Sequence, residues 1–199
     1  MKSIFIFRRD FRLTDNIGLI KACKNNERVY PIFIFTPEQI KKNDFKSSNA
    51  VQFMIESLKD LDSSLKKHGS KLNLYYSDYL DVIEDLVKTN NITNVYTNTD
   101  YTPYAIKREK EIDKLSKRID FNFCYYDDVC IFKPGTILNG SDKYYQKFTP
   151  FYKSALKEKF PKVKKLKKKY KEKLSYFKNN KYSISFEEAM KFYDFNENL

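Results

Sequence analysis

The stretch MKSIFIFRRDFRLTDN, residues 1–16, decides the fold of this chain. An apolar run at residues 4–7 is followed at once by six polar side chains: Arg8, Arg9, Asp10, Arg12, Asp15 and Asn16. A short β-branched and aromatic run bounded by charge predicts a buried strand of a parallel sheet. Residues 14–16 then offer N-cap chemistry for a helix through residues 17–24. The charged loop lies where open α/β sheets place their ligands.

The rest of the chain alternates the same two patterns. After the first strand at residues 2–8, apolar runs predict strands at 29–35, 72–76, 94–97 and 120–126. Helices are predicted at residues 51–65, 78–88 and 104–116, and a connector rich in Lys and Asn precedes the first of these. The sequence therefore predicts an α/β fold with a doubly wound, five-stranded parallel sheet. This Rossmann-like sheet has the order 3-2-1-4-5 and helices on both faces.

Composition restricts the class of protein. Lys and Arg exceed Asp and Glu by 38 − 26 = 12, which favours polyanionic partners, although a lysine-rich solvated surface explains the charge equally well. Three cysteines without CxxC spacing and a single histidine, His68, predict no metal site. No apolar run is long enough to cross a bilayer, and no signal peptide precedes the first strand. We expect a soluble, intracellular protein that does not bind membranes.

Two further patterns follow strands that should end beside the charged loop. In NTDYTPYAIKRE, residues 98–109, Asp100 can accept a hydrogen bond from a flat ligand, and Tyr101 and Tyr104 can pack on it. The alternative is a plain helix entry, with Thr102 as cap. In FIFTP, residues 33–37, Phe35 and Thr36 either line the same crevice or form only an apolar wall. The charged loop has its own alternative, an internal network of ion pairs that fixes the loop.

The last seventy residues have a different character. An extended excursion begins at residue 129, and a lysine-dense run covers residues 157–173. Its lysines can contact phosphates, but few aromatic residues are interleaved, so an exposed linker is the favoured interpretation. Residues 186–195 predict one amphipathic helix with little to pack against.

The three patterns above resemble the α/β domain of the DNA photolyase/cryptochrome family in residue and order: FRRDFRLTDN, residues 7–16; FIFTP, residues 33–37; and NTDYTPYAIKRE, residues 98–109. Two further segments resemble the family as well: NAVQFMIESLKDLD, residues 49–62, and the segment after the sheet, DDVCIFKPGTILNGSDKYYQKFTPFYKSALK. The resemblance covers residues 1 to about 160. It implies that residues 1–128 are the α/β domain that binds an antenna chromophore. Residues 129–199 would be the interdomain connector and basic linker, and the carboxyl-terminal FAD-binding helical domain is absent from this sequence.

The resemblance also implies a binding site. The antenna would be a deazaflavin, a flavin or a folate, held by Arg9, Asp10, Phe35, Thr36, Asp100 and Tyr101. Ala50 stands where deazaflavin-using members often have arginine, and Thr102 stands near a glutamate of folate-using members. The identity of the antenna therefore stays open.

The implied function depends on a second chain. The family binds FAD in the helical domain that this sequence lacks, and its electron relay uses tryptophan, of which this sequence has none. We therefore expect neither FAD on this chain alone nor catalytic residues within it. The expected function is the antenna-binding half of a split or truncated deoxyribodipyrimidine photolyase, a carbon–carbon lyase. It would work with a separate FAD-binding helical chain, docked through apolar residues of segment 148–156 and of the tail, and reach damaged DNA indirectly. The alternatives are a stand-alone nucleotide- or flavin-binding light sensor and a non-functional remnant.

Overall fold

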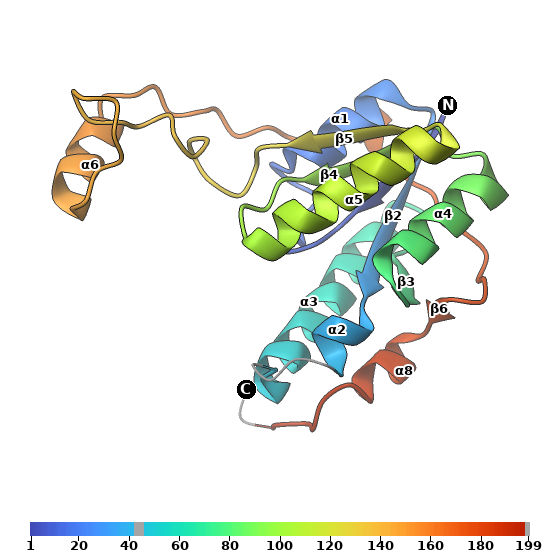
Figure 1. Ribbon diagram of the computed structural model, residues 1–199. Coiled ribbons are helices and arrows are strands. Elements are labelled where there is room, and N and C mark those ends of the chain that lie inside the picture. The colour runs from blue at the N-terminus through green and yellow to red at the C-terminus, as the bar shows by residue number, and fades with distance from the viewer. Residues whose placement is uncertain (42–45, 198–199) are drawn as a thin grey trace.

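The computed structural model describes residues 1–41 and 46–197, and across them six strands form one sheet (Figure 1). Its order is β5-β4-β1-β2-β3-β6. The parallel part consists of β1 Lys2–Ile6, β2 Arg28–Phe35, β3 Asn73–Tyr76, β4 Asn94–Asn98 and β5 Asn122–Tyr126. The predicted order of these five strands is confirmed.

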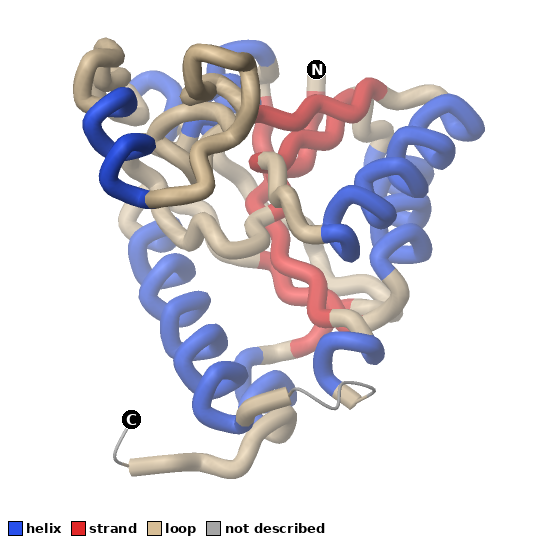
Figure 2. The backbone as a smooth tube through the Cα atoms, turned by 60° about the vertical axis from the view of Figure 1, so that its left-hand side comes forward, coloured by secondary structure: helices blue, strands red, loops and turns tan. Residues whose placement is uncertain are grey.

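Helices cover both faces of the sheet, as the sequence predicts (Figure 2). The helices of the described residues are α1 Ile17–Asn25, α2 Pro37–Ile40, α3 Ser48–Lys66, α4 Tyr79–Asn90, α5 Pro103–Ile119, α6 Phe148–Ala155, α7 Lys168–Lys171 and α8 Phe186–Met190, and α6 alone projects away from the sheet (Figure 1). The expected connector between β2 and α3 contains α2, and its residues 42–45 lie outside the described part of the chain.

Two apolar cores lie on opposite sides of the central strands. Side chains alternate along β1, so Phe5 packs with α1 and α3, whereas Ile4 and Ile6 pack with α4 and α5. All three are fully buried. Burial on both faces explains why these strands have continuous apolar runs rather than an alternating pattern.

The prediction of a five-stranded, all-parallel sheet is wrong in one respect. The sixth strand, β6 Ser183–Ile184, pairs antiparallel with β3 through Leu74 and Tyr75. Backbone hydrogen bonds form this pairing, and two residues are too few for an apolar pattern to show in the sequence. The sheet is therefore mixed, with a short strand covering one edge.

The prediction that the tail has little to pack against is also wrong. Helix α8 contacts α3, and the Phe192 ring lies 5.4 Å from the ring of Phe35 and 5.0 Å from that of Tyr76. Gln52 of α3 bonds the backbone of Asn196 through both its amide nitrogen and its oxygen. The tail therefore forms part of the α/β unit.

We expect Phe192→Ala to lower the free energy of unfolding by about 2 kcal/mol, because a half-buried ring is lost from an aromatic cluster. Phe195→Ala is the matched control, since that ring is 65% exposed and should contribute almost nothing. Urea titrations followed by circular dichroism measure both. Equal losses in the two variants would show that the tail is not packed as described.

Residues 129–163 differ from the rest of the chain. They leave the end of β5, carry α6 away from the sheet and return toward α1 (Figure 1). Within the described residues, no helix is both long enough and apolar enough to span a membrane.

Candidate functional site

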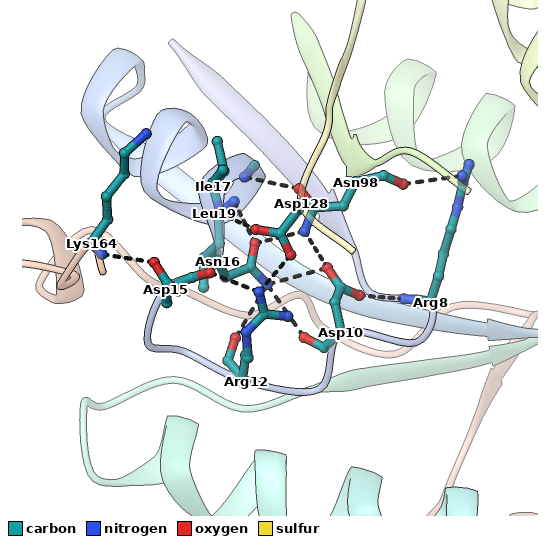
Figure 3. Close-up of polar contacts among 11 residues, drawn as sticks. Arg8, Asp10, Arg12, Asp15, Asn16, Ile17, Leu19, Asn98, Asp128 and Lys164 are labelled. Atoms are coloured by element: carbon teal, nitrogen blue, oxygen red, sulfur yellow. Dashed lines mark hydrogen bonds and ion pairs between the residues drawn. The ribbon is translucent and has the colours of Figure 1, made fainter. Parts of the chain in front are cut away.

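The loop after β1 is held by a buried carboxylate (Figure 3). Asp10, only 5% exposed, accepts hydrogen bonds from the backbone nitrogen of Arg8 at 3.0 Å and from Asn16 Nδ2 at 3.2 Å. It also accepts one from Asn98 Nδ2, at the end of β4. Three separate segments therefore meet on this one side chain.

The start of α1 is fastened to the same point. Asn16 is its N-cap, accepting from the Leu19 nitrogen at 3.0 Å, and Asn98 Oδ1 accepts from the Gly18 nitrogen at 2.9 Å. A Cβ on Gly18 would lie 2.5 Å from Asn98 Oδ1 and 2.9 Å from Phe5 Cε2. Only glycine lets helix and strand approach this closely.

A second carboxylate, from the segment after β5, binds the end of the same loop. Asp128, beyond β5, accepts from Arg12 Nη2 at 2.6 Å and from the Ile17 nitrogen at 2.8 Å. Arg12 also donates to the carbonyl of Asp15. The internal-network interpretation of the charged loop therefore describes Asp10, Arg12 and Asn16, while the loop itself frames a cleft.

The cleft lies at the carboxyl ends of β1, β2 and β4 and has a volume of about 690 Å³. This is where the sequence places a ligand, because β1 is the point at which the strand order reverses. The apolar part of its lining includes Phe7, Phe11, Phe33, Phe53, Met54 and Tyr104. The polar part includes Arg8, Arg9, Thr36, Gln39, Asp100 and Arg108.

Two arginines that line the cleft each contain a buried nitrogen without a hydrogen-bond partner in the described part of the chain. Arg8 Nη1 forms a buried ion pair with Glu109 Oε1 at 2.6 Å, and Arg108 stacks over the rings of Tyr79 and Tyr104 at 4.9 and 5.4 Å. Among the described residues, neither Arg8 Nη2 nor Arg108 Nε finds an acceptor, although both are buried. A buried donor without a partner carries a desolvation penalty that a ligand oxygen would remove.

Charge in the cleft is fixed by local contacts. Burial opposes the charge of Arg8, but contacts with Tyr79 and Glu109 outweigh it and raise the Arg8 pKa. Burial alone would raise the pKa of Asp100, but the Thr102 amide and Arg9 lower it below the usual value. Asp100 is therefore a carboxylate at neutral pH, and it accepts hydrogen bonds only.

The structure separates the six residues named from the sequence into two groups. Arg9, Thr36 and Asp100 line the cleft, and Arg9 Nε lies 3.7 Å from Asp100 Oδ2. The other three do not line it: Asp10 fixes the loop, Phe35 is fully buried in the core, and Tyr101 donates to Asp127 at 2.6 Å. Burial, and then that hydrogen bond, raise the pKa of Tyr101.

Sequence reasoning missed several cleft residues. Tyr79 is the first residue of α4, Arg108 comes from the second turn of α5, and Phe53 and Met54 come from the second turn of α3. Phe53 is 67% exposed, a large apolar side chain on the wet side of an amphipathic helix. The sequence offered one signal for this residue: Phe53 is aromatic and does not fall on the apolar stripe of its helix.

Comparison with known proteins agrees with this geometry. The profile of the family described as DNA photolyase matches residues 3–169. The deoxyribodipyrimidine photo-lyase of Buchnera aphidicola is 31% identical over 158 residues, which cover 76% of this chain and 33% of that protein. The chain spans about a third of the length of the curated relatives it matches.

Solved structures share the fold over nearly the whole chain. An archaeal photolyase from Sulfolobus tokodaii, described with two FAD molecules and an implied novel light-harvesting cofactor, is 33% identical. The TM-score is 0.83, and the match covers 98% of this chain and 42% of that one. A Synechocystis cryptochrome, 19% identical, has a TM-score of 0.82 over 98% of this chain and 41% of its own, which shows the fold alone. The sequence motifs, the sheet order and these matches together show that the chain belongs to the DNA photolyase/cryptochrome family.

Proposed function

We propose that the cleft binds a planar antenna chromophore and that the chain supports light-driven DNA repair together with a separate FAD-binding helical chain. One observation carries the first half of this proposal: two arginines that line a cleft with aromatic walls each contain a buried nitrogen without an acceptor within residues 1–41 and 46–197. The chromophore, when bound, absorbs light and passes the excitation to FAD.

The cleft fits such a ligand in size and chemistry. Its volume of about 690 Å³ falls in the range of small-molecule sites. Phe53, Met54 and Tyr104 offer apolar surface to the faces of a ring system. Arg8 Nη2 and Arg108 Nε can donate to ring carbonyl or phosphate oxygens, and Asp100 can accept from a ring N–H or a ribityl hydroxyl.

A flavin is the first ligand to test. The Sulfolobus tokodaii relative was described with two FAD molecules, and an implied light-harvesting cofactor is part of its description. Ala50, in place of the arginine that deazaflavin users often have, agrees with a flavin as well.

A competitive capture experiment identifies the ligand. The full chain is incubated with equal amounts of FMN, FAD, a deazaflavin and a folate, passed through a desalting column, and analysed by mass spectrometry. We expect one of these compounds to be retained at about one per chain. A folded chain that retains none of them would overturn the antenna proposal.

Arg108→Ala should weaken chromophore binding by roughly ten-fold or more, because a charge-assisted hydrogen bond and a stacked cation are lost. Lys107→Ala is the matched control, since Lys107 is exposed on α5 and does not line the cleft. Equilibrium dialysis gives both dissociation constants. Unchanged affinity in the Arg108 variant would exclude this arginine from the site.

Residues 129–163 support the second half of the proposal. They form an apolar hollow of about 730 Å³ on the projecting segment, with Phe148 and Tyr152 stacked at 5.7 Å. Phe148 and Tyr152 are both exposed, and so are Phe151 and Leu156. An exposed apolar patch of this kind indicates a docking surface, so the isolated chain should tend to self-associate.

Docking can be tested with the helical FAD-binding part of the Sulfolobus tokodaii relative as the probe. We expect a mixed complex on size-exclusion chromatography, and its loss in the variant Phe148→Asp/Tyr152→Asp. Lys107→Asp/Lys110→Asp, on the exposed face of α5, is the control. A chain that stays monomeric and forms no complex with the probe would contradict the proposed partnership. If it still bound chromophore, it would be a stand-alone light-sensing module.

A further inference from the structure

From residue 164 on, the lysine-dense run packs against the α/β unit and is not a free linker. Residues 157–173 contain ten lysines and two glutamates. The backbone of Lys164 is bonded twice to Asp15, with the Asp15 nitrogen donating to the Lys164 carbonyl at 2.8 Å and the Lys164 nitrogen donating to Asp15 Oδ1 at 2.7 Å. This joins the run to the loop before α1.

Further anchors follow along the run. Leu166 and Leu174 are buried in the core that α1 and α3 share, and Tyr170 packs against it. At the far end, Val29 of β2 donates to the Lys173 carbonyl and accepts from the Ser175 nitrogen, both at 2.9 Å. The backbone from residue 164 to residue 175 is therefore tied to the α/β unit at both ends and between them.

Anchoring turns the apolar side chains inward and leaves the ammonium groups in water. We define the lysine ridge as Lys164, Lys165, Lys167, Lys168, Lys169 and Lys171, joined by Lys67 at the end of α3. Lys67, Lys168 and Lys171 line one hollow of about 430 Å³ with His68 and Glu172. Partial burial, and then Lys171 and Lys67, lower the pKa of His68.

The positive charge of the lysine ridge is not neutralised within the described part of the chain. Ion pairs there engage lysines of other segments, such as Lys66 with Asp62 and Lys88 with Glu84, and none engages a ridge lysine. Lys169 instead lies over the Tyr170 ring at 5.4 Å. A row of unpaired cations on a rigid support is suited to a polyanion.

We propose that the lysine ridge binds the sugar–phosphate backbone of nucleic acid, without regard to sequence or lesion. Lysine ammonium groups act here as point charges on phosphates, with affinity that comes from counterion release. An anionic membrane fits less well, because interfacial anchoring adds burial of an apolar face to the attraction of charge. Leu166 and Leu174 face the protein core, and Val163, 68% exposed, is the one aliphatic side chain of residues 162–175 that stays in water. The ridge is separate from the cleft and shares no residue with its lining.

The salt dependence of binding tests this proposal. Fluorescence anisotropy with a labelled, undamaged duplex is measured at several salt concentrations from about 50 to 300 mM. Lys165→Gln/Lys168→Gln/Lys171→Gln should weaken binding about ten-fold or more at low salt. It should also make the slope of log affinity against log salt shallower by about 2 to 3. Lys107→Gln/Lys110→Gln/Lys114→Gln, which changes the net charge equally on the other face of the sheet, should match the wild type.

Three results would overturn the proposal: equal losses in both triple variants, no loss in either, or tighter retention on phosphatidylglycerol vesicles than on duplex. Equal affinity for damaged and undamaged duplex is expected. The ridge variant should bind chromophore as the wild type does. The proposal for the ridge and the proposal for the antenna site can therefore be refuted independently of each other.

Discussion

Asp10→Ala should lower the free energy of unfolding by about 3 to 5 kcal/mol, the largest single-residue effect outside the apolar core. The substitution removes the buried acceptor that the Arg8 amide, Asn16 Nδ2 and Asn98 Nδ2 share. The two asparagine amides keep weaker or competing acceptors in the carbonyls of residues 10 and 12 and in Asn16 Oδ1, so the Arg8 amide is affected most. A buried donor that loses its partner cannot recover its bond to water. Because the carboxylate joins β1, α1 and β4, the cleft should also lose its shape, and chromophore binding should fall with stability.

Two control variants distinguish the loss of these hydrogen bonds from the loss of a charge as such. Arg9→Ala removes a side chain that is 70% exposed and should change the unfolding free energy by less than about 0.5 kcal/mol. Asp10→Asn keeps the shape but turns one acceptor into a donor that faces other donors, so its loss should lie between the two. Urea titrations measure all three. A loss below about 1 kcal/mol for Asp10→Ala would mean that the loop is not held by this carboxylate.

Gly18→Ala should cost about 2 to 3 kcal/mol, because a single methyl group has no room between α1 and β4. Its Cβ would lie within 3.0 Å of both the Asn98 side-chain oxygen and the Phe5 ring. Either Asn98 releases the Gly18 amide or the helix moves away from the sheet. Both responses loosen the wall of the cleft as well as the core.

Gly140→Ala is the matched control for this prediction. Nothing lies within 4 Å of a Cβ built there, so the change should be neutral or stabilise the chain by a few tenths of a kcal/mol. Thermal unfolding by circular dichroism ranks the two variants. A Gly18 variant as stable as the Gly140 variant would contradict the close approach of α1 to β4.

Much of the fold could be predicted from local sequence. Apolar runs such as residues 4–7 mark strands buried on both faces, and side-chain oxygens mark helix starts, as at Asn16 and Thr102. The right-handed crossover rule then leaves few orders for five parallel strands. The sixth strand and the packed tail could not be predicted, because backbone pairing and a few aromatic contacts near Phe192 form them.

The site could be predicted in location but not in detail. Charged residues after β1 and β4 correctly indicated that the site lies at the carboxyl ends of the strands, and Asp100 does line the cleft there. Tyr101, its neighbour, points to Asp127 instead, since adjacent side chains leave the chain in different directions. Arg108 and Phe53 come from helix faces, and the docking angle of each helix decides whether such a residue reaches the cleft.

The central claim is that the cleft binds a chromophore, and a fluorescence titration of FMN tests it most directly. We expect saturable binding, one FMN per chain, with a dissociation constant in the micromolar range or tighter. Phe53→Asp should weaken it about ten-fold or more, because one aromatic wall is replaced by a carboxylate. Tyr144→Asp is the matched control, being 65% exposed on the projecting segment against 67% for Phe53. Binding that is lost equally in both variants, or not saturable in the wild type, would contradict a flavin antenna in this cleft.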